Sequence, residues 1–179
     1  MARRPWLAQA WLSAVDDLAL DTAPVRAGRA LARRGAVGAL LTATGTVTAS
    51  VRDGDDAWTA TWAVTPLHDR AWQAVLDLLI IRPAHWAALL DGDLPRGLVV
   101  DAEDAGVKLL PDAGSLEPVC TCEDWEVPCR HAAAVAFCVA DALGEGPWTL
   151  LTLLGRRPAA VVKAEAAHRA RLVLGEHRP

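Results

Sequence analysis

The sequence predicts an α+β fold, in which a small antiparallel β-meander packs against helices and a β-turn leads directly into one of those helices. Apolar residues recur at helical spacing in several segments. Two neighbouring runs rich in Val and Thr are separated by Gly45, which is typical of a hairpin. With 179 residues, of which 53% are hydrophobic, the chain is long enough to bury a core without the help of a metal.

The N-terminal segment predicts two helices. Residues 5–20 place apolar side chains at i, i+3 or i+4, and i+7, the pattern of an amphipathic helix. Residues 24–34 predict a short second helix, because Pro24 suits a first helical turn and Gly35 a helix C-terminus.

Three consecutive antiparallel strands follow. They are predicted at residues 37–44, 46–52 and 57–64. Gly45 separates the first two strands, and the turn signal at residues 53–56 separates the second from the third. Because side chains alternate along a strand, Trp58 and Trp62 are expected on one face.

The remainder of the chain predicts mainly helices. These helices are expected at residues 67–81, 84–90, 130–143, 147–154 and 158–174. Residues 106–110 predict one further short strand before Pro111. The expected organisation has three parts. They are an N-terminal helical segment at 1–35, an α+β core at 36–157 with a finger at about 118–145, and a C-terminal helix and tail at 158–179.

The strongest chemical signal lies between residues 120 and 131. Two cysteines two residues apart are followed, after six residues, by a cysteine and a histidine two apart; the four are Cys120, Cys122, Cys129 and His131. Two such ligand pairs on a short loop match the tetrahedral sulfur and nitrogen coordination of zinc. Four protein ligands leave no open position for water, so the sequence predicts one structural Zn²⁺ in a β-turn-to-helix zinc finger.

A framework of two disulfides is the alternative interpretation of four cysteines. A bridge between Cys120 and Cys122 is awkward at that spacing. A bridge between Cys129 and Cys138 would have to join opposite sides of one helix. Cys138 also lies too far along the helix from His131 to share its metal, so we expect it to be a small buried side chain.

The charge distribution argues against a nucleic-acid binder that uses its whole surface. The net charge is −4, whereas such proteins are usually basic. Six arginines and three aspartates lie in residues 1–35, while residues 53–128 hold fifteen acidic and four basic residues. The arginines of residues 24–34 are expected to form a solvated face that pairs with this acidic middle, with phosphate contact as the alternative.

Candidate contacts for a protein or nucleic-acid partner are Arg29, Arg33, Arg34, Trp125 and Arg130. Arg130 is also expected to offset the negative charge of a centre with three thiolates. Trp125 stands among acidic residues in the predicted zinc loop. We expect it to pack over the metal cluster, with anchoring of a partner as the alternative.

The pattern Cys-x-Cys-x-Asp-Trp-x-x-Pro-Cys-x-His, with Pro-Trp-x-Leu-Leu-x-Leu-x-Gly-Arg at 147–156 and the strand-forming stretch at 29–52, resembles bacterial SWIM zinc finger proteins. The resemblance covers about residues 5–157, and the arginine-rich, lysine-poor composition indicates an actinobacterial source. The resemblance implies zinc binding. By association it implies an accessory factor that binds a protein partner in a DNA-processing complex, in the neighbourhood of a Swi/Snf-type ATPase. Direct DNA binding through the Arg-rich ends and a redox-sensitive zinc switch remain alternatives.

No segment predicts an enzyme or a membrane protein. The sequence has neither a phosphate-binding Gly-Lys-Ser/Thr loop nor a dinucleotide fingerprint. The N-terminus imitates a signal peptide, but Gln9 and Ser13 interrupt its apolar stretch and Asp16 ends it early. We therefore expect a non-enzymatic, cytoplasmic protein that makes no membrane contact.

Overall fold

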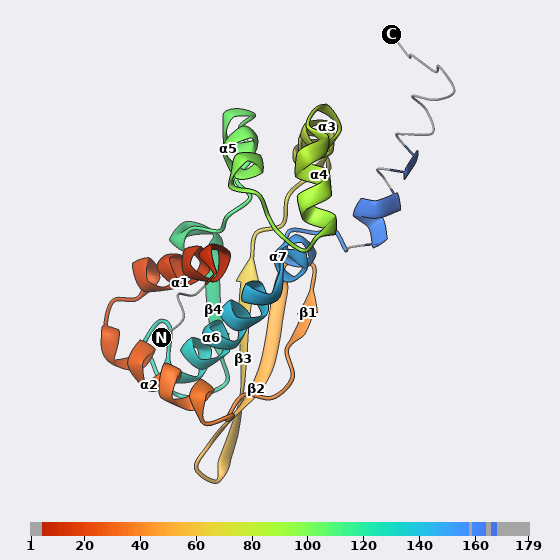
Figure 1. Cartoon of the computed structure of the whole chain (residues 1–179). Coiled ribbons are helices and arrows are strands. Elements are labelled where there is room, and N and C mark those ends of the chain that lie inside the picture. The colour runs from red at the N-terminus through yellow and green to blue at the C-terminus, as the bar shows by residue number, and fades with distance from the viewer. Residues whose placement is uncertain (1–4, 158, 164–165, 168–179) are drawn as a thin grey trace.

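The computed structural model describes residues 5–157, 159–163 and 166–167 (Figure 1). Within the predicted C-terminal helix, residues 159–163 and 166–167 are helical. The rest of that predicted helix, and the arginines of the signal-like N-terminus, lie outside the described residues. The fold is α+β, as predicted.

The sheet is a four-stranded antiparallel meander in the order β1-β2-β3-β4. The strands are β1 (Leu41–Ala43), β2 (Thr46–Asp53), β3 (Asp56–Val64) and β4 (Leu116–Cys120). The three predicted strands are confirmed, although the first is shorter than expected because Val37 forms only an isolated bridge with Val51. The sequence did not predict β4, which pairs with β3 from more than 50 residues away and places Cys120 opposite Ala60.

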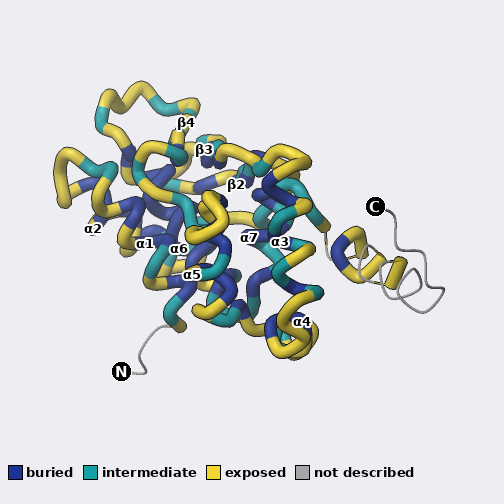
Figure 2. The backbone as a smooth tube through the Cα atoms, turned by 90° about the horizontal axis from the view of Figure 1, so that it is seen from above, coloured by how far each residue is buried: buried dark blue, intermediate teal, exposed yellow. Residues whose placement is uncertain are grey.

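The helices gather on one face of this sheet (Figures 1 and 2). The central helix is α6 (Arg130–Glu145), and α1 (Trp6–Leu18) and α2 (Thr22–Arg33) pack against it. Strand alternation explains the arrangement, since Val47, Ala49 and Val51 of β2 are buried towards the helices.

Small side chains allow the helices to approach one another closely. α6 is rich in alanine, and its residues 131–137 are all buried. Opposite them, α2 presents Gly28, where a Cβ atom would lie 2.5 Å from the Cβ of Ala133 and 2.6 Å from the carbonyl oxygen of Arg130. The glycine is therefore required by the contact between these two helices.

Buried tryptophans hold α6 in place by hydrogen bonds as well as by packing. The indole N–H of Trp62 donates to the carbonyl of Ala132 at 2.8 Å, and that of Trp11 donates to the carbonyl of Ala136 at 3.1 Å. The two rings meet edge to face at 5.9 Å. These indoles join β3 and α1 to the same helix with their polar atoms satisfied.

Three of the remaining helices form one end of the molecule (Figure 1): α3 (Asp69–Ile81), α4 (Pro83–Leu90) and α5 (Arg96–Asp104). The short 3-10 helix η1 (Ala113–Ser115) contacts α1, and α7 (Trp148–Leu153) contacts α6 and β1. The sequence did not predict α5. This helix is joined to α4 by a hydrogen bond between His85 Nε2 of α4 and Asp101 Oδ2 of α5, at 2.8 Å. The strand predicted at 106–110 is wrong: the segment buries Val107 and Leu109, but it has no regular secondary structure and pairs with no strand among the described residues.

No single helix in the described part of the chain is long and apolar enough to cross a membrane. Only α3 and α4 taken together reach the required length and composition, and the pair is bent by 101° at its break.

Gly28→Ala is expected to destabilise the fold by about 1–3 kcal/mol, because the new methyl group would overlap α6. Gly144→Ala is the matched control, since its Cβ atom would meet only the ring of Pro5 at an ordinary 3.5 Å. The control should be neutral or stabilising by up to about 1 kcal/mol. Thermal unfolding of the two variants checks whether the first is less stable than the unmodified chain and the second is not. Equal melting temperatures would contradict the close approach of α2 to α6.

Candidate metal centre

The four predicted ligands come from two adjoining elements. Cys120 ends β4, and Cys122 lies in the bend that follows. The pairing of β4 continues beyond Cys120, since the Thr121 N–H donates to the Thr59 carbonyl at 3.0 Å. Cys129 is the N-cap of α6 and accepts a hydrogen bond from the Ala132 N–H at 3.4 Å. His131 is in the first turn of that helix, so the cluster joins the end of a strand to the start of a helix.

The geometry of the four side chains suits a single metal ion. One ligand atom from each of Cys120, Cys122, Cys129 and His131 lies within 4.8 Å of the other three. Tetrahedral zinc with bonds of about 2.3 Å to sulfur and about 2.0 Å to nitrogen separates its ligands by about 3.5–3.8 Å. Cys129 and His131 are buried, while Cys120 and Cys122 are half-buried. Three thiols and one imidazole at this spacing fit a structural zinc site.

The two nitrogens of His131 face different groups. Nδ1 lies 3.9 Å from the Cys120 sulfur, on the side of the cluster. Nε2 lies 3.3 Å from Oδ2 of Asp53, at the end of β2. A carboxylate that accepts the Nε2–H leaves the Nδ1 lone pair free for a metal, which is the arrangement that orients metal-binding histidines in proteins.

Asp53 is itself held by two arginines. Arg34 Nη2 lies 2.8 Å from its Oδ1, and Arg130 Nε lies 2.9 Å from its Oδ2. Trp58 of β3 stacks on the His131 ring with the centroids 5.8 Å apart. The imidazole is therefore fixed by a carboxylate and by an aromatic face, both from the β2–β3 hairpin.

Burial raises the pKa of two of the ligand thiols, those of Cys120 and Cys129. It raises the pKa of the Cys120 thiol to about 12, with contributions from the neighbouring Cys122 and Cys129 sulfurs. Zinc binds the thiolates, so it must displace their protons, and its affinity for the site falls as the pH is lowered.

The five residues predicted to contact a partner have different surroundings in the structure. Arg34 pairs with Asp53, as expected for an arginine face that meets the acidic middle, and Arg130 makes a second ion pair with the same carboxylate. Arg29 lies over the ring of Phe137 at 5.8 Å, and Arg33 is exposed. The expectation that Trp125 packs over the cluster is wrong, because its side chain is 86% exposed.

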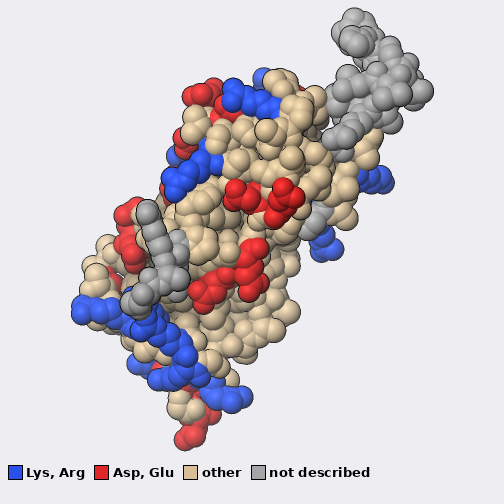
Figure 3. Space-filling model, viewed as in Figure 1, with Lys and Arg blue, Asp and Glu red and all other residues tan. Residues whose placement is uncertain are grey.

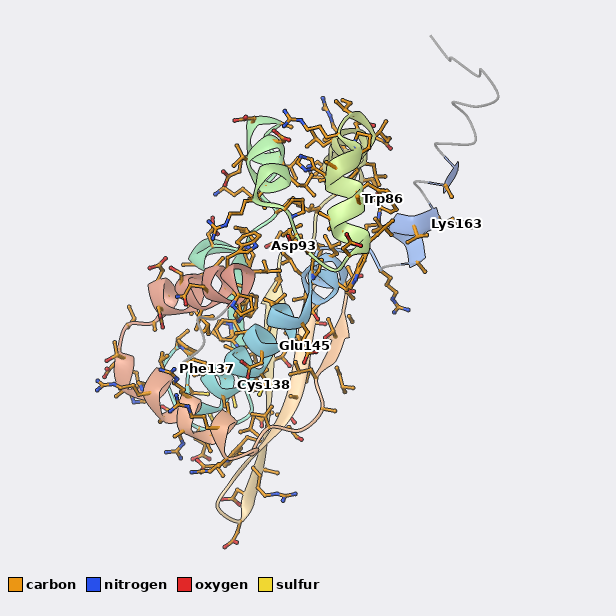
Figure 4. The ribbon with its side chains drawn as sticks, in the orientation of Figure 1. Trp86, Asp93, Phe137, Cys138, Glu145 and Lys163 are labelled. Atoms are coloured by element: carbon orange, nitrogen blue, oxygen red, sulfur yellow. The ribbon has the colours of Figure 1, made fainter. Side chains whose placement is uncertain are left out.

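Cys138 lies outside the cluster, beside Phe137 on α6 (Figure 4). It is half-buried and so less enclosed than the core position that we expected. Burial raises the pKa of its thiol, and the nearby Asp141 adds to the rise.

Sequence reasoning missed Asp53 and Trp58. Asp53 belongs to a turn signal and is 78 residues from His131, so no local pattern connects the two. Trp58 was correctly placed on the same face as Trp62, and that face is the one that meets the start of α6.

Comparisons with known proteins agree with this geometry. Residues 100–140 match the family model of the SWIM zinc finger, so this part of the chain is a SWIM zinc finger. A protein of Mycobacterium tuberculosis, named "Uncharacterized protein Rv2102", is 29% identical over 167 residues. The alignment covers 92% of this chain and 60% of that protein, so the chain spans about 60% of the length of its relative. The relative fits the predicted actinobacterial source, and no solved structure matches the chain.

Asp53→Asn is expected to weaken zinc binding by about 10- to 100-fold, because it removes the charged acceptor that orients His131. Asp56→Asn, on the other side of the same turn, is the control and should bind zinc as the unmodified chain does. Competition with a chromophoric chelator measures both affinities. Equal affinities in the two variants would show that Asp53 does not orient the ligand.

Proposed function

We propose that this SWIM zinc finger is a non-catalytic docking module, in which zinc holds residues 123–127 in a fixed shape and the loop offers Trp125 to a protein partner. The observation that carries the proposal is the 86% exposure of Trp125 midway between the two ligand pairs. All the other tryptophans of the chain are buried or half-buried. Exposed tryptophans on ordered loops are frequent anchors of protein interfaces.

The loop is constrained at both ends and within. Cys122 and Cys129 flank it, and a carboxylate oxygen of Asp124 accepts a hydrogen bond from the Glu126 N–H at 3.2 Å. A metal bound to both cysteines would fix the ends of the loop before any partner arrives. Such preorganisation lowers the entropy lost on binding.

The charge around Trp125 indicates the chemistry of the partner surface. Glu123, Asp124 and Glu126 flank Trp125 in the sequence, and Val127, two residues further on, is 49% exposed. Desolvation raises the pKa of Glu126, and the charges of Asp124 and Asp21 raise it further. A partner with an apolar pocket and a rim of Arg or Lys would bury the indole and relieve this repulsion.

We place this module in a DNA-processing complex, as an accessory factor beside a Swi/Snf-type ATPase in the cytoplasm. The SWIM match supports this placement by association. Three thiolate ligands are best maintained in a reducing compartment, which supports the cytoplasmic location. The closed set of four ligands supports a structural rather than an enzymatic role.

Direct nucleic-acid binding is the second candidate. Figure 3 shows Lys and Arg side chains gathered over the end of the molecule where α2 lies. Arg34 and Arg130 are already engaged by Asp53, however, and Arg29 by Phe137. This arrangement leaves fewer arginines available for phosphate, so we rank this candidate below protein docking. Binding of DNA that weakens steeply with salt would favour it.

Trp125→Ala is expected to weaken capture of the ATPase partner by at least about 30-fold, as the loss of an aromatic hot spot does. Zinc content and melting temperature should not change, because the side chain is exposed. Leu20→Ala removes another exposed apolar side chain, 93% accessible and outside the finger, and should have no effect. Co-purification from cells, with zinc quantified in the same samples, compares the three proteins. Full capture by the Trp125 variant would rule out the loop as the docking element.

A further inference from the structure

The face of the sheet that points away from the helices is uncovered by any described helix (Figure 2). Its side chains alternate with the buried ones along each strand. The face consists of Leu41, Ala43, Thr46, Thr48, Ser50, Arg52, Ala57, Thr59, Thr61, Ala63, Glu117, Val119 and Thr121. All of these residues are exposed or half-exposed. We refer to this set as the outer sheet face.

The outer sheet face is almost free of charge. Its interior consists of small and hydroxyl-bearing side chains, and only Arg52 and Glu117 are ionisable. A water-facing sheet surface is normally polar, and here the polarity comes from hydroxyl groups rather than charges; depletion of charge marks the centres of protein interfaces. This composition indicates a surface that is covered in the functional state.

One row across the sheet shows how the face can be desolvated at low cost. The register aligns Leu41 with Thr48, Thr48 with Thr61, and Thr61 with Val119. The Thr48 and Thr61 hydroxyls lie 2.8 Å apart and bond to each other. Leu41 and Val119 end the row at opposite edges, 71% and 55% exposed. The row therefore offers apolar area with its central hydroxyls already paired.

The two charges stand at opposite corners of the face. Arg52 is on β2 beside the β2–β3 turn, and Glu117 is on β4 towards the far end of the sheet. Neither forms an ion pair with another residue of the described segments. A two-fold axis in the plane of the face can set Arg52 of each copy beside Glu117 of the other.

We propose that the outer sheet face docks onto the same face of a second copy of this chain, which forms a two-fold symmetric dimer. The occupant follows from the charges, because a neutral face with one positive and one negative corner is complementary to itself. Face-to-face packing is favoured over continuation of the sheet at β4. Pro118 lacks the N–H that an added strand would need from that edge.

The area of the outer sheet face limits how tightly two copies can bind each other. Four strands about 4.8 Å apart and some six residues long cover a patch of roughly 15 by 20 Å. Roughly 300 Å² per copy lies below the range of stable specific interfaces, so the dimer should be weak and should form only at high protein concentration. The inference is independent of the docking role proposed for Trp125, which lies in the finger loop and outside this face.

Analytical ultracentrifugation of the zinc-loaded chain over a range of concentrations tests the proposal. The unmodified chain should pass from monomer to dimer as the concentration rises. Arg52→Glu and Glu117→Arg should each weaken dimerisation at least about tenfold, because each sets like charges together at two symmetric positions. The double variant restores the opposite-charge pairs and should return dimerisation to within about threefold of the unmodified chain.

Three further variants show whether dimerisation depends on the outer sheet face and not on other exposed residues. Val119→Lys should weaken the dimer, whereas Leu20→Lys, at an exposed position outside the face, should not. Trp125→Ala should leave dimerisation unchanged, so loss of partner capture and loss of the dimer can be told apart. Circular dichroism confirms that each variant is folded. A chain that stays monomeric at every concentration would overturn the proposal, as would a double variant no better than the single ones.

Discussion

The rest of the structure depends on the connection between the end of β4 and the start of α6, made by three cysteines and one histidine. All four ligand atoms lie within 4.8 Å of one another. Through His131 the cluster reaches Asp53, and through Asp53 it reaches Arg34 beyond α2 and Arg130 of α6. A metal bound here would therefore brace the hairpin, the central helix and the N-terminal helices together, and would add directly to folding free energy.

This network changes the meaning of the arginines and tryptophans. The arginines near α2 were expected to pair with the acidic middle of the chain, with phosphate contact as the alternative. Arg34 does pair with Asp53, the carboxylate that orients a ligand, and Arg29 covers an aromatic ring. Most tryptophans likewise serve the interior, where Trp11 and Trp62 donate hydrogen bonds to α6. Trp125 differs from them because it is exposed, and this contrast is the basis of the docking role that we propose for it.

The sequence predicts those features that local patterns specify. Ligand spacing, helix periodicity and hairpin turns all act within about a dozen residues, and they located the metal cluster, the meander and α6. Features that depend on distant partners were missed. β4 is five residues long and contains Pro118, so it looks like a poor strand until β3 is present to pair with it. Asp53 is a turn residue by pattern, and only the fold brings it to His131.

X-ray absorption at the zinc edge of the loaded protein tests whether the metal centre is closed. We predict one zinc per chain with three sulfur neighbours at about 2.3 Å and one nitrogen at about 2.0 Å, and no additional oxygen ligand. Two sulfur neighbours, or a bound water in the shell, would contradict a closed structural centre built from Cys120, Cys122, Cys129 and His131.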